Sequence, residues 1–190
     1  MISDGHKFIF IHIPKTAGTS LCNIFLKEKA YIHTKKGRYY QSHVSVKDLE
    51  ITNSDELDKY FTFSFVRNPW DIMVSWYKFR KCRNLSFDKF LTEYKIKNKY
   101  TYWLPETLYQ TDFLLDENDN PLVDFIGRFE NLQQDFNIIC DKIGIPHQKL
   151  PHKNKTKHKH YTEYYDDETR QIVAEKFAKD IEYFGYEFGK

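Results

Sequence analysis

The sequence FIFIHIPKTAGTS, residues 8–20, contains the strongest structural signal in the chain. Its first half is rich in β-formers and almost continuously apolar, as expected of a strand that is covered on both faces. The apolar run ends at Pro14, and Thr19 and Ser20 are able to cap a helix over residues 21–30, where apolar side chains recur at helical spacing. The stretch therefore predicts a strand, a loop and a helix.

The loop between this strand and this helix offers several groups that bind anions. Backbone N–H groups, hydroxyl groups and one lysine lie beside a helix N-terminus, which carries a partial positive charge. They come from Lys15, Thr16, Ala17, Gly18, Thr19 and Ser20. The loop lacks the G-x-x-x-x-G-K-[ST] spacing of nucleoside triphosphatases, and no predicted strand ends in an Asp for the magnesium that such enzymes need. It therefore predicts an anion site of another kind.

A second junction of the same type follows later in the chain. Residues 60–66 predict a buried strand and residues 69–82 a helix, for which Asn68 is a typical N-cap. Arg67 lies at the end of the strand, and Ser75 lies two turns into the helix. Two such junctions predict a ligand with two separate anionic groups.

The remaining segments complete an α/β pattern. They are a polar segment (31–45), a short helical stretch (46–60), a helix after Ser86, a hairpin around residues 116–121, a helix over 131–143 ended by Gly144, a basic loop (146–161) and a final helix (166–184). Parallel strands joined by helices predict a three-layer fold in which helices flank a central, mostly parallel sheet. Ligands are expected at the carboxyl ends of the strands. The length of 190 residues predicts a single domain, residues 1–190.

Composition narrows the class of protein further. Charged residues make up 29% of the chain but the net charge is only +2, so any anion must be recognised by local clusters, and a nucleic-acid partner is not expected. The three cysteines, Cys22, Cys82 and Cys140, have neither disulfide nor metal-ligand spacing. We therefore expect a reducing, cytoplasmic location and no metal.

Membrane and export signals are not expected in this chain. It has no run of about 18 apolar residues, so no membrane span is predicted. The first predicted strand begins too early to leave room for a signal peptide. We expect a soluble protein that is not exported, unless an upstream anchor has been removed.

Two motifs and their order carry a resemblance to a known family. Residues 10–21, FIHIPKTAGTSL, resemble the 5′-phosphosulfate loop of sulfotransferases that use 3′-phosphoadenosine 5′-phosphosulfate (PAPS). Residues 63–77, FSFVRNPWDIMVSWY, resemble the 3′-phosphate motif of the same enzymes. Residues 124–132 and 179–186 are similar to the small family that contains the carbohydrate 2-O-sulfotransferases. The resemblance covers most of the chain and is weakest over residues 85–109.

This resemblance implies a P-loop NTPase-like sulfotransferase fold and an activity. The enzyme would transfer a sulfonate from PAPS to a hydroxyl group, with a carbohydrate as the expected acceptor, and release adenosine 3′,5′-bisphosphate (PAP). Lys15 would stabilise the charge that develops on the leaving phosphate. Arg67 and Ser75 would hold the 3′-phosphate. Further donors to the 5′-phosphosulfate would be Thr16, Ala17, Gly18, Thr19 and Ser20.

The acceptor hydroxyl needs a base, and the resemblance assigns that role to His43. Its ordinary pKa near ~6.5 suits proton transfer around neutrality. His12, close to the anion loop, is the main alternative, and His33 is a third.

The basic segment 146–161 has three interpretations. The first is a solvent-exposed stretch of charged residues, and the second is a metal site. The third is implied by the resemblance: a late loop that closes over the nucleotide, with Lys153, Lys155 or Thr156 near a phosphate. Two other functions also remain open for the whole chain. One is a nucleotide kinase on a P-loop-like fold, and the other is a non-catalytic module that binds anions or glycans.

Overall fold

The structure is a computed structural model that describes residues 1–27, 32–34, 37–39, 45–48, 58–79, 85–93, 109–151 and 159–190. The chain divides into two compact units. The first contains residues 1–66 and 112–154, and the second contains residues 67–111 and 155–190. The chain leaves the first unit for the second between Val66 and Arg67. Within the described residues, no helix combines the length and the apolar character needed to cross a membrane.

The first unit is built on a four-stranded sheet with the strand order β1-β2-β5-β6. The strands are β1 (Ile2–Ser3), β2 (Phe8–Ile11), β5 (Phe61–Val66) and β6 (Phe125–Arg128). β1 runs antiparallel to β2, whereas β2, β5 and β6 are parallel, with Ile11 opposite Ser64. The predicted α/β class with a mostly parallel sheet is confirmed.

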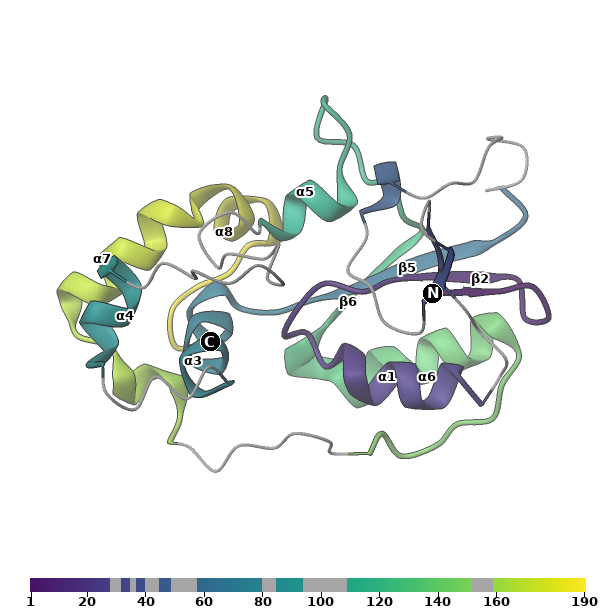
Figure 1. Cartoon of the computed structure of the whole chain (residues 1–190), viewed down its shortest axis with the longest axis horizontal. Coiled ribbons are helices and arrows are strands. Elements are labelled where there is room, and N and C mark those ends of the chain that lie inside the picture. The colour runs from purple at the N-terminus through teal and green to yellow at the C-terminus, as the bar shows by residue number, and fades with distance from the viewer. Residues whose placement is uncertain are drawn as a thin grey trace. The chain divides into compact units, whose positions relative to one another are not determined.

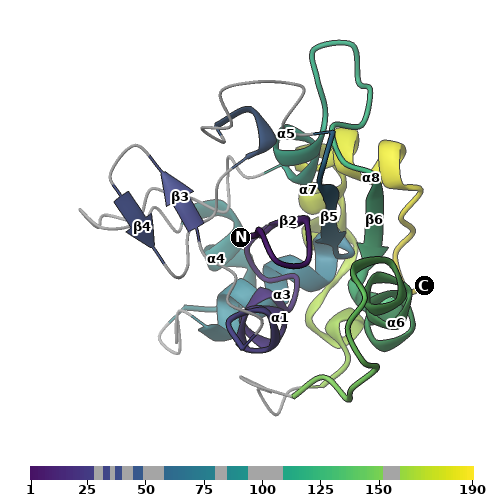
Figure 2. The ribbon, with the colours of Figure 1, turned by 90° about the vertical axis from the view of Figure 1, so that its right-hand side faces the viewer.

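Helices α1 (Gly18–Phe25) and α6 (Leu132–Ile143) cover one face of this sheet, as Figure 2 shows. Because alternate residues of a strand point to the same face, Phe8 and Phe10 of β2 reach the helices together with Phe63 of β5. The ring of Phe25 lies 4.9 Å from that of Phe8 and 5.6 Å from that of Phe63. These aromatic contacts fix α1, and with it the loop that precedes α1, against the sheet.

Short elements complete the described part of the first unit. They are the antiparallel pair β3 (Ile32–Thr34) and β4 (Gly37–Tyr39) and the 3-10 turns η1 (Val46–Asp48) and η2 (Phe129–Asn131). The predicted helix over 131–143 is confirmed as α6. Gly144 ends it in the left-handed conformation, with φ 69°.

The described elements of the second unit are helical. They are α3 (Pro69–Phe79), α4 (Phe87–Glu93), η3 (Tyr161–Tyr164), α7 (Asp167–Lys176) and α8 (Ala178–Phe184), and helix α5 (Gln110–Leu114) begins there and ends in the first unit. Helices α3, α4 and α7 pack against one another (Figure 1). The ring of Phe188 is edge-on to those of Trp70, Tyr161 and Tyr165. An aromatic cluster therefore forms the centre of this unit.

Three local predictions were wrong, each because a contact distant in sequence or a backbone turn overrides the local pattern. Thr19 and Ser20 do not cap α1, since Ala17 takes the N-cap position and both residues lie in the first turn. The hairpin around residues 116–121 is reduced to one bridge, Leu115 with Pro121, because β6 pairs with β5 instead. The final helix is broken at Phe177, whose buried ring packs on Tyr109.

Candidate functional site

The anion loop, residues 14–20, follows β2 at the carboxyl edge of the sheet. Lys15 and Ala17 both adopt the left-handed backbone conformation, each with φ 68°. This conformation costs a residue other than glycine about 1–2 kcal/mol. Strain of this kind concentrates at functional sites, because the surrounding structure must hold it in place.

The left-handed residues bring the chain directly into the N-terminus of α1. The N–H groups of Ser20 and Leu21 donate to the carbonyl oxygen of Ala17, at 2.9 and 3.3 Å. Gly18 and Thr19 are the first two residues of α1, so their N–H groups have no acceptor within the helix. Free N–H groups at a helix start, together with the helix dipole, favour an anion. Lys15, which belongs to the same loop, is half-buried.

The hydroxyl groups of the anion loop do not all face a ligand. Thr16 is fully buried, and its Oγ1 donates to the carbonyl oxygen of Ile13 at 2.8 Å. This hydroxyl therefore stabilises the turn. Ser20 is buried as well, whereas Thr19 is half-buried.

Gly18 is required by the ring of His12. A Cβ atom on Gly18 would lie 1.7 Å from His12 Nε2, far inside van der Waals contact. The His12 ring also stacks on Phe10, with 5.7 Å between centroids, and its Nδ1 lies 3.9 Å from Cys22 Sγ. The structure thus places His12, the main alternative base, in the packing between β2 and α1. Burial raises the pKa of the neighbouring Cys22 thiol to about 11, so the thiol is neutral at pH 7.

Arg67 begins the second unit directly after β5, and its side chain is held by Asp71. The guanidinium Nε and Nη2 atoms each lie 2.8 Å from Asp71 Oδ2, and both side chains are largely buried. Ser75 lies four residues beyond Asp71 on α3, so both occupy the same face of that helix. Asp71 thus contacts Arg67 and shares a helix face with Ser75, and it is a residue that the sequence reasoning missed. The i, i+4 spacing from Arg67 was the available signal.

The backbone around Arg67 is also fixed by side chains. Asn68 caps α3 as predicted, because its Oδ1 accepts a hydrogen bond of 3.1 Å from the N–H of Trp70. Gln110 contacts Arg67 itself: its Oε1 accepts from the Arg67 N–H at 2.8 Å, and its Nε2 donates to the Arg67 carbonyl at 2.9 Å. Gln110 was not predicted, and no local pattern in the sequence singles it out.

Several predicted site residues lie outside the described residues. They are His43, Lys153, Lys155 and Thr156. His33 lies on β3, opposite Arg38 of β4. The roles assigned to these five residues stay predictions.

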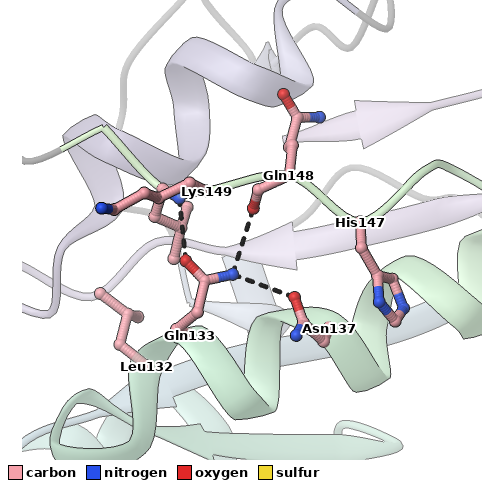
Figure 3. A pocket seen from close by; sticks show the side chains of 7 residues that line it. Leu132, Gln133, Asn137, His147, Gln148 and Lys149 are labelled. Atoms are coloured by element: carbon pink, nitrogen blue, oxygen red, sulfur yellow. Dashed lines mark hydrogen bonds between the residues drawn. The ribbon is translucent and has the colours of Figure 1, made fainter.

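A pocket of about 490 Å³ lies against α6 in the first unit (Figure 3). Its lining comes from the first half of α6 and from residues 147–150. The Gln133 amide holds the two walls together, since its Nε2 donates to Asn137 Oδ1 and to the Gln148 carbonyl while its Oε1 accepts from the Leu150 N–H. None of the predicted site residues is among those that line it.

The fold agrees with a comparison against known families. The sequence matches the sulfotransferase family over residues 1–187, which is nearly the whole chain. The protein therefore belongs to the sulfotransferase family and is an enzyme. It is also similar to an uncharacterized protein of Archaeoglobus fulgidus, with 39% identity over 95 residues that cover 48% of this chain and 73% of that protein. Family membership implies PAPS as the sulfonate donor.

Proposed function

We propose that this sulfotransferase transfers the sulfonate of PAPS to a hydroxyl group of a carbohydrate, with Lys15 as the principal catalytic residue. The observation that carries this proposal is the left-handed conformation of Lys15 and Ala17 at the start of α1. A lysine and the first N–H groups of a helix thereby belong to a single short loop. The resemblance of residues 124–132 and 179–186 to the carbohydrate 2-O-sulfotransferases supports the acceptor class.

The residues of the anion loop fit a phosphosulfate group. Residues 14–20 contain no Asp or Glu, so no carboxylate of the loop repels the ligand. N–H donors and one ammonium group match an acceptor-only anion. Arg67 and Ser75 fit a phosphate, because a guanidinium donates to two phosphate oxygens and a serine adds a single hydroxyl.

Each residue of this chain then has one proposed task. PAPS supplies the sulfonate together with a bisphosphate leaving group. The Lys15 ammonium neutralises charge on the leaving phosphate. Residues 16–20 hold the 5′-phosphosulfate, and Arg67 and Ser75 hold the 3′-phosphate. His43 accepts the proton of the acceptor hydroxyl.

Three further parts of the proposal rest on the sequence. The basic segment contacts a phosphate of the nucleotide through Lys153, Lys155 and Thr156. The enzyme works without a metal. The cysteine pattern supports a cytoplasmic location.

A ligand-binding experiment tests the donor. PAP at 100 times its Kd should raise the free energy of unfolding by about 2.7 kcal/mol, whereas ATP with magnesium should have a much smaller effect. The reverse preference would support the nucleotide kinase. Binding that survives Lys15→Ala and weakens steeply with salt would support the non-catalytic anion-binding module.

An acceptor screen tests the rest of the reaction. Radiolabelled PAPS is offered with mono- and oligosaccharides and, separately, with phenols and aliphatic alcohols. Transfer to saccharides alone supports the proposed acceptor class, and transfer to phenols alone contradicts it.

The base is tested by His43→Ala, with His147→Ala as the matched control. His147 is exposed and lies 2.7 Å from Asp141, so its loss should leave turnover unchanged. His43→Ala should abolish turnover while PAP binding is retained. Weaker PAP binding in this variant would instead assign His43 to the donor site.

A further inference from the structure

The Gln110 side chain clamps the backbone on both sides of Arg67. Its amide binds the Arg67 N–H at 2.8 Å and the Arg67 carbonyl at 2.9 Å. A residue of a neighbouring strand would offer the same pair of groups, one acceptor and one donor. The amide therefore extends sheet-like pairing to Arg67, one residue beyond the end of β5.

Gln110 is itself held by the carboxylate of Asp180 on α8. Asp180 Oδ2 accepts from the Gln110 N–H at 2.8 Å. Asp180 Oδ1 accepts from the N–H of Thr111 at 3.0 Å and from its hydroxyl at 2.9 Å. All four residues, Arg67 included, belong to the second unit. The chain of contacts thus runs from α8 through the start of α5 to Arg67.

Burial makes this chain of contacts rigid. Gln110 and Thr111 are 1% exposed and Asp180 is fully buried, so water does not replace a broken hydrogen bond. Burial raises the pKa of the Asp180 carboxyl, while the hydrogen bonds from Thr111 and Gln110 favour its ionised form. With no solvent to compete, the Gln110 amide has one favourable orientation.

We propose that Gln110, anchored by Asp180, is a positioning residue that orients Arg67 toward the 3′-phosphate of the donor. This inference rests on the proposed function, in which Arg67 binds that phosphate. A guanidinium recognises phosphate through fixed, planar geometry, so a rotation of the Arg67 backbone weakens binding more than it would for a lysine. Asp71 fixes the guanidinium end of the side chain, and Gln110 fixes its backbone end.

The test measures selectivity for the 3′-phosphate by isothermal titration. The ratio of the Kd for adenosine 5′-monophosphate to the Kd for PAP isolates the contribution of the 3′-phosphate. A smaller folded fraction changes both constants equally and leaves their ratio unchanged. Gln110→Leu removes both hydrogen bonds to Arg67 at similar volume, and Gln110→Met does the same should the first variant not fold.

Thr111→Val is the matched control. Thr111 is as buried as Gln110, and the variant loses the hydrogen bond from the Thr111 hydroxyl to Asp180. The two hydrogen bonds from the Gln110 amide to Arg67 do not involve the Thr111 side chain. Arg67→Ala tests the proposed function separately, because it removes the phosphate ligand itself.

The expected result is a selectivity ratio about tenfold smaller in the Gln110 variants, unchanged affinity for the monophosphate, and a wild-type ratio in Thr111→Val. An unchanged ratio in the Gln110 variants, with Arg67→Ala losing selectivity, would overturn the positioning role alone. An equal loss in Thr111→Val would reduce Gln110 to a general structural residue and also overturn it. An unchanged ratio in Arg67→Ala would overturn the assignment of Arg67 and the inference that depends on it.

Discussion

The anion loop of the first unit and the Arg67 turn of the second unit, residues 67–71, are fixed in different ways. In the anion loop the backbone is strained, with two left-handed residues, and the Thr16 hydroxyl donates to the carbonyl oxygen of Ile13 within the same turn. The Arg67 turn is held by side chains, since Asp71 binds the guanidinium group of Arg67 and Gln110 binds its backbone. The two segments therefore differ in what fixes them: left-handed backbone conformation is prominent in the anion loop, and hydrogen bonds from side chains are prominent around Arg67.

The two designs also differ in the sequence separation of their contacts. Several contacts around the anion loop join residues close in sequence, as in the pairs of His12 with Gly18 and with Cys22. Those that shape the Arg67 turn reach 43 residues to Gln110 and then 70 residues to Asp180. Substitutions should therefore act locally in the first case and at a distance in the second.

The largest expected effect is that of Lys15→Ala on catalysis. Loss of a charged donor at the leaving group should lower kcat by about 10³-fold, or about 4 kcal/mol, while the melting temperature stays close to that of the wild type. Steady-state transfer rates and thermal melts measure both quantities. Lys7→Ala is the matched control, because Lys7 is an exposed lysine that also has a positive φ, 49°. Wild-type turnover in Lys15→Ala would remove the catalytic role from this loop.

Gly18→Ala should have the largest effect on stability. The added methyl group would overlap the His12 ring, and overpacking of this kind costs about 3 kcal/mol. Urea denaturation measures the loss. Gly5→Ala, where a Cβ atom meets nothing within 4 Å, should change stability by less than about 0.5 kcal/mol. The double variant His12→Ala/Gly18→Ala should be more stable than Gly18→Ala alone, and a simple sum of the two losses would contradict the contact.

Asp71→Asn should cause the next largest loss of stability. It tests whether the Arg67 turn, in contrast to the anion loop, depends on an ion pair. It leaves the largely buried Arg67 charge without its carboxylate, which should lower the free energy of unfolding by about 2 kcal/mol. Asp141→Asn is the control, because the contact of Asp141 with His147 is exposed and should contribute less than about 0.5 kcal/mol. Equal losses in the two variants would mean that the Arg67 turn does not depend on its ion pair.

Ala17→Gly should have the smallest effect, and in the opposite direction. Glycine relieves the left-handed strain at φ 68° but loses more backbone entropy on folding, so stability should rise by about 0.5 kcal/mol. The same exchange at Ala174, inside α7, should lower stability by about 1 kcal/mol. Loss at both positions, seen in paired denaturation curves, would show that the anion loop is not strained.

The sequence predicts those parts of the molecule in which neighbouring residues determine the structure. Residues 8–25 form the expected strand, loop and helix, because apolar periodicity and the break at Pro14 are local. Asn68 caps α3 for the same reason. The left-handed conformation of Lys15 and Ala17 has no such signal, since glycine is the usual residue there.

Contacts between distant residues could not be read from the sequence. β6 pairs with β5 in place of the expected hairpin. This pairing has no local signal in the sequence, because it joins segments about 60 residues apart. Gln110 and Asp180 lie in segments with no recognisable motif, and only the tertiary structure brings them to Arg67. Asp71 is the intermediate case, because helical spacing alone would have paired it with Arg67.

The Gln110 clamp also sets an order of events during synthesis. The contacts that shape the anion loop are available once the first 66 residues, which include β2, α1 and β5, have left the ribosome. The Arg67 turn has to wait for Asp180, which follows Gln110 by 70 residues. Because contacts between residues distant in sequence are closed late, the arginine reaches its final conformation only after the segment that contains Asp180 has been synthesised.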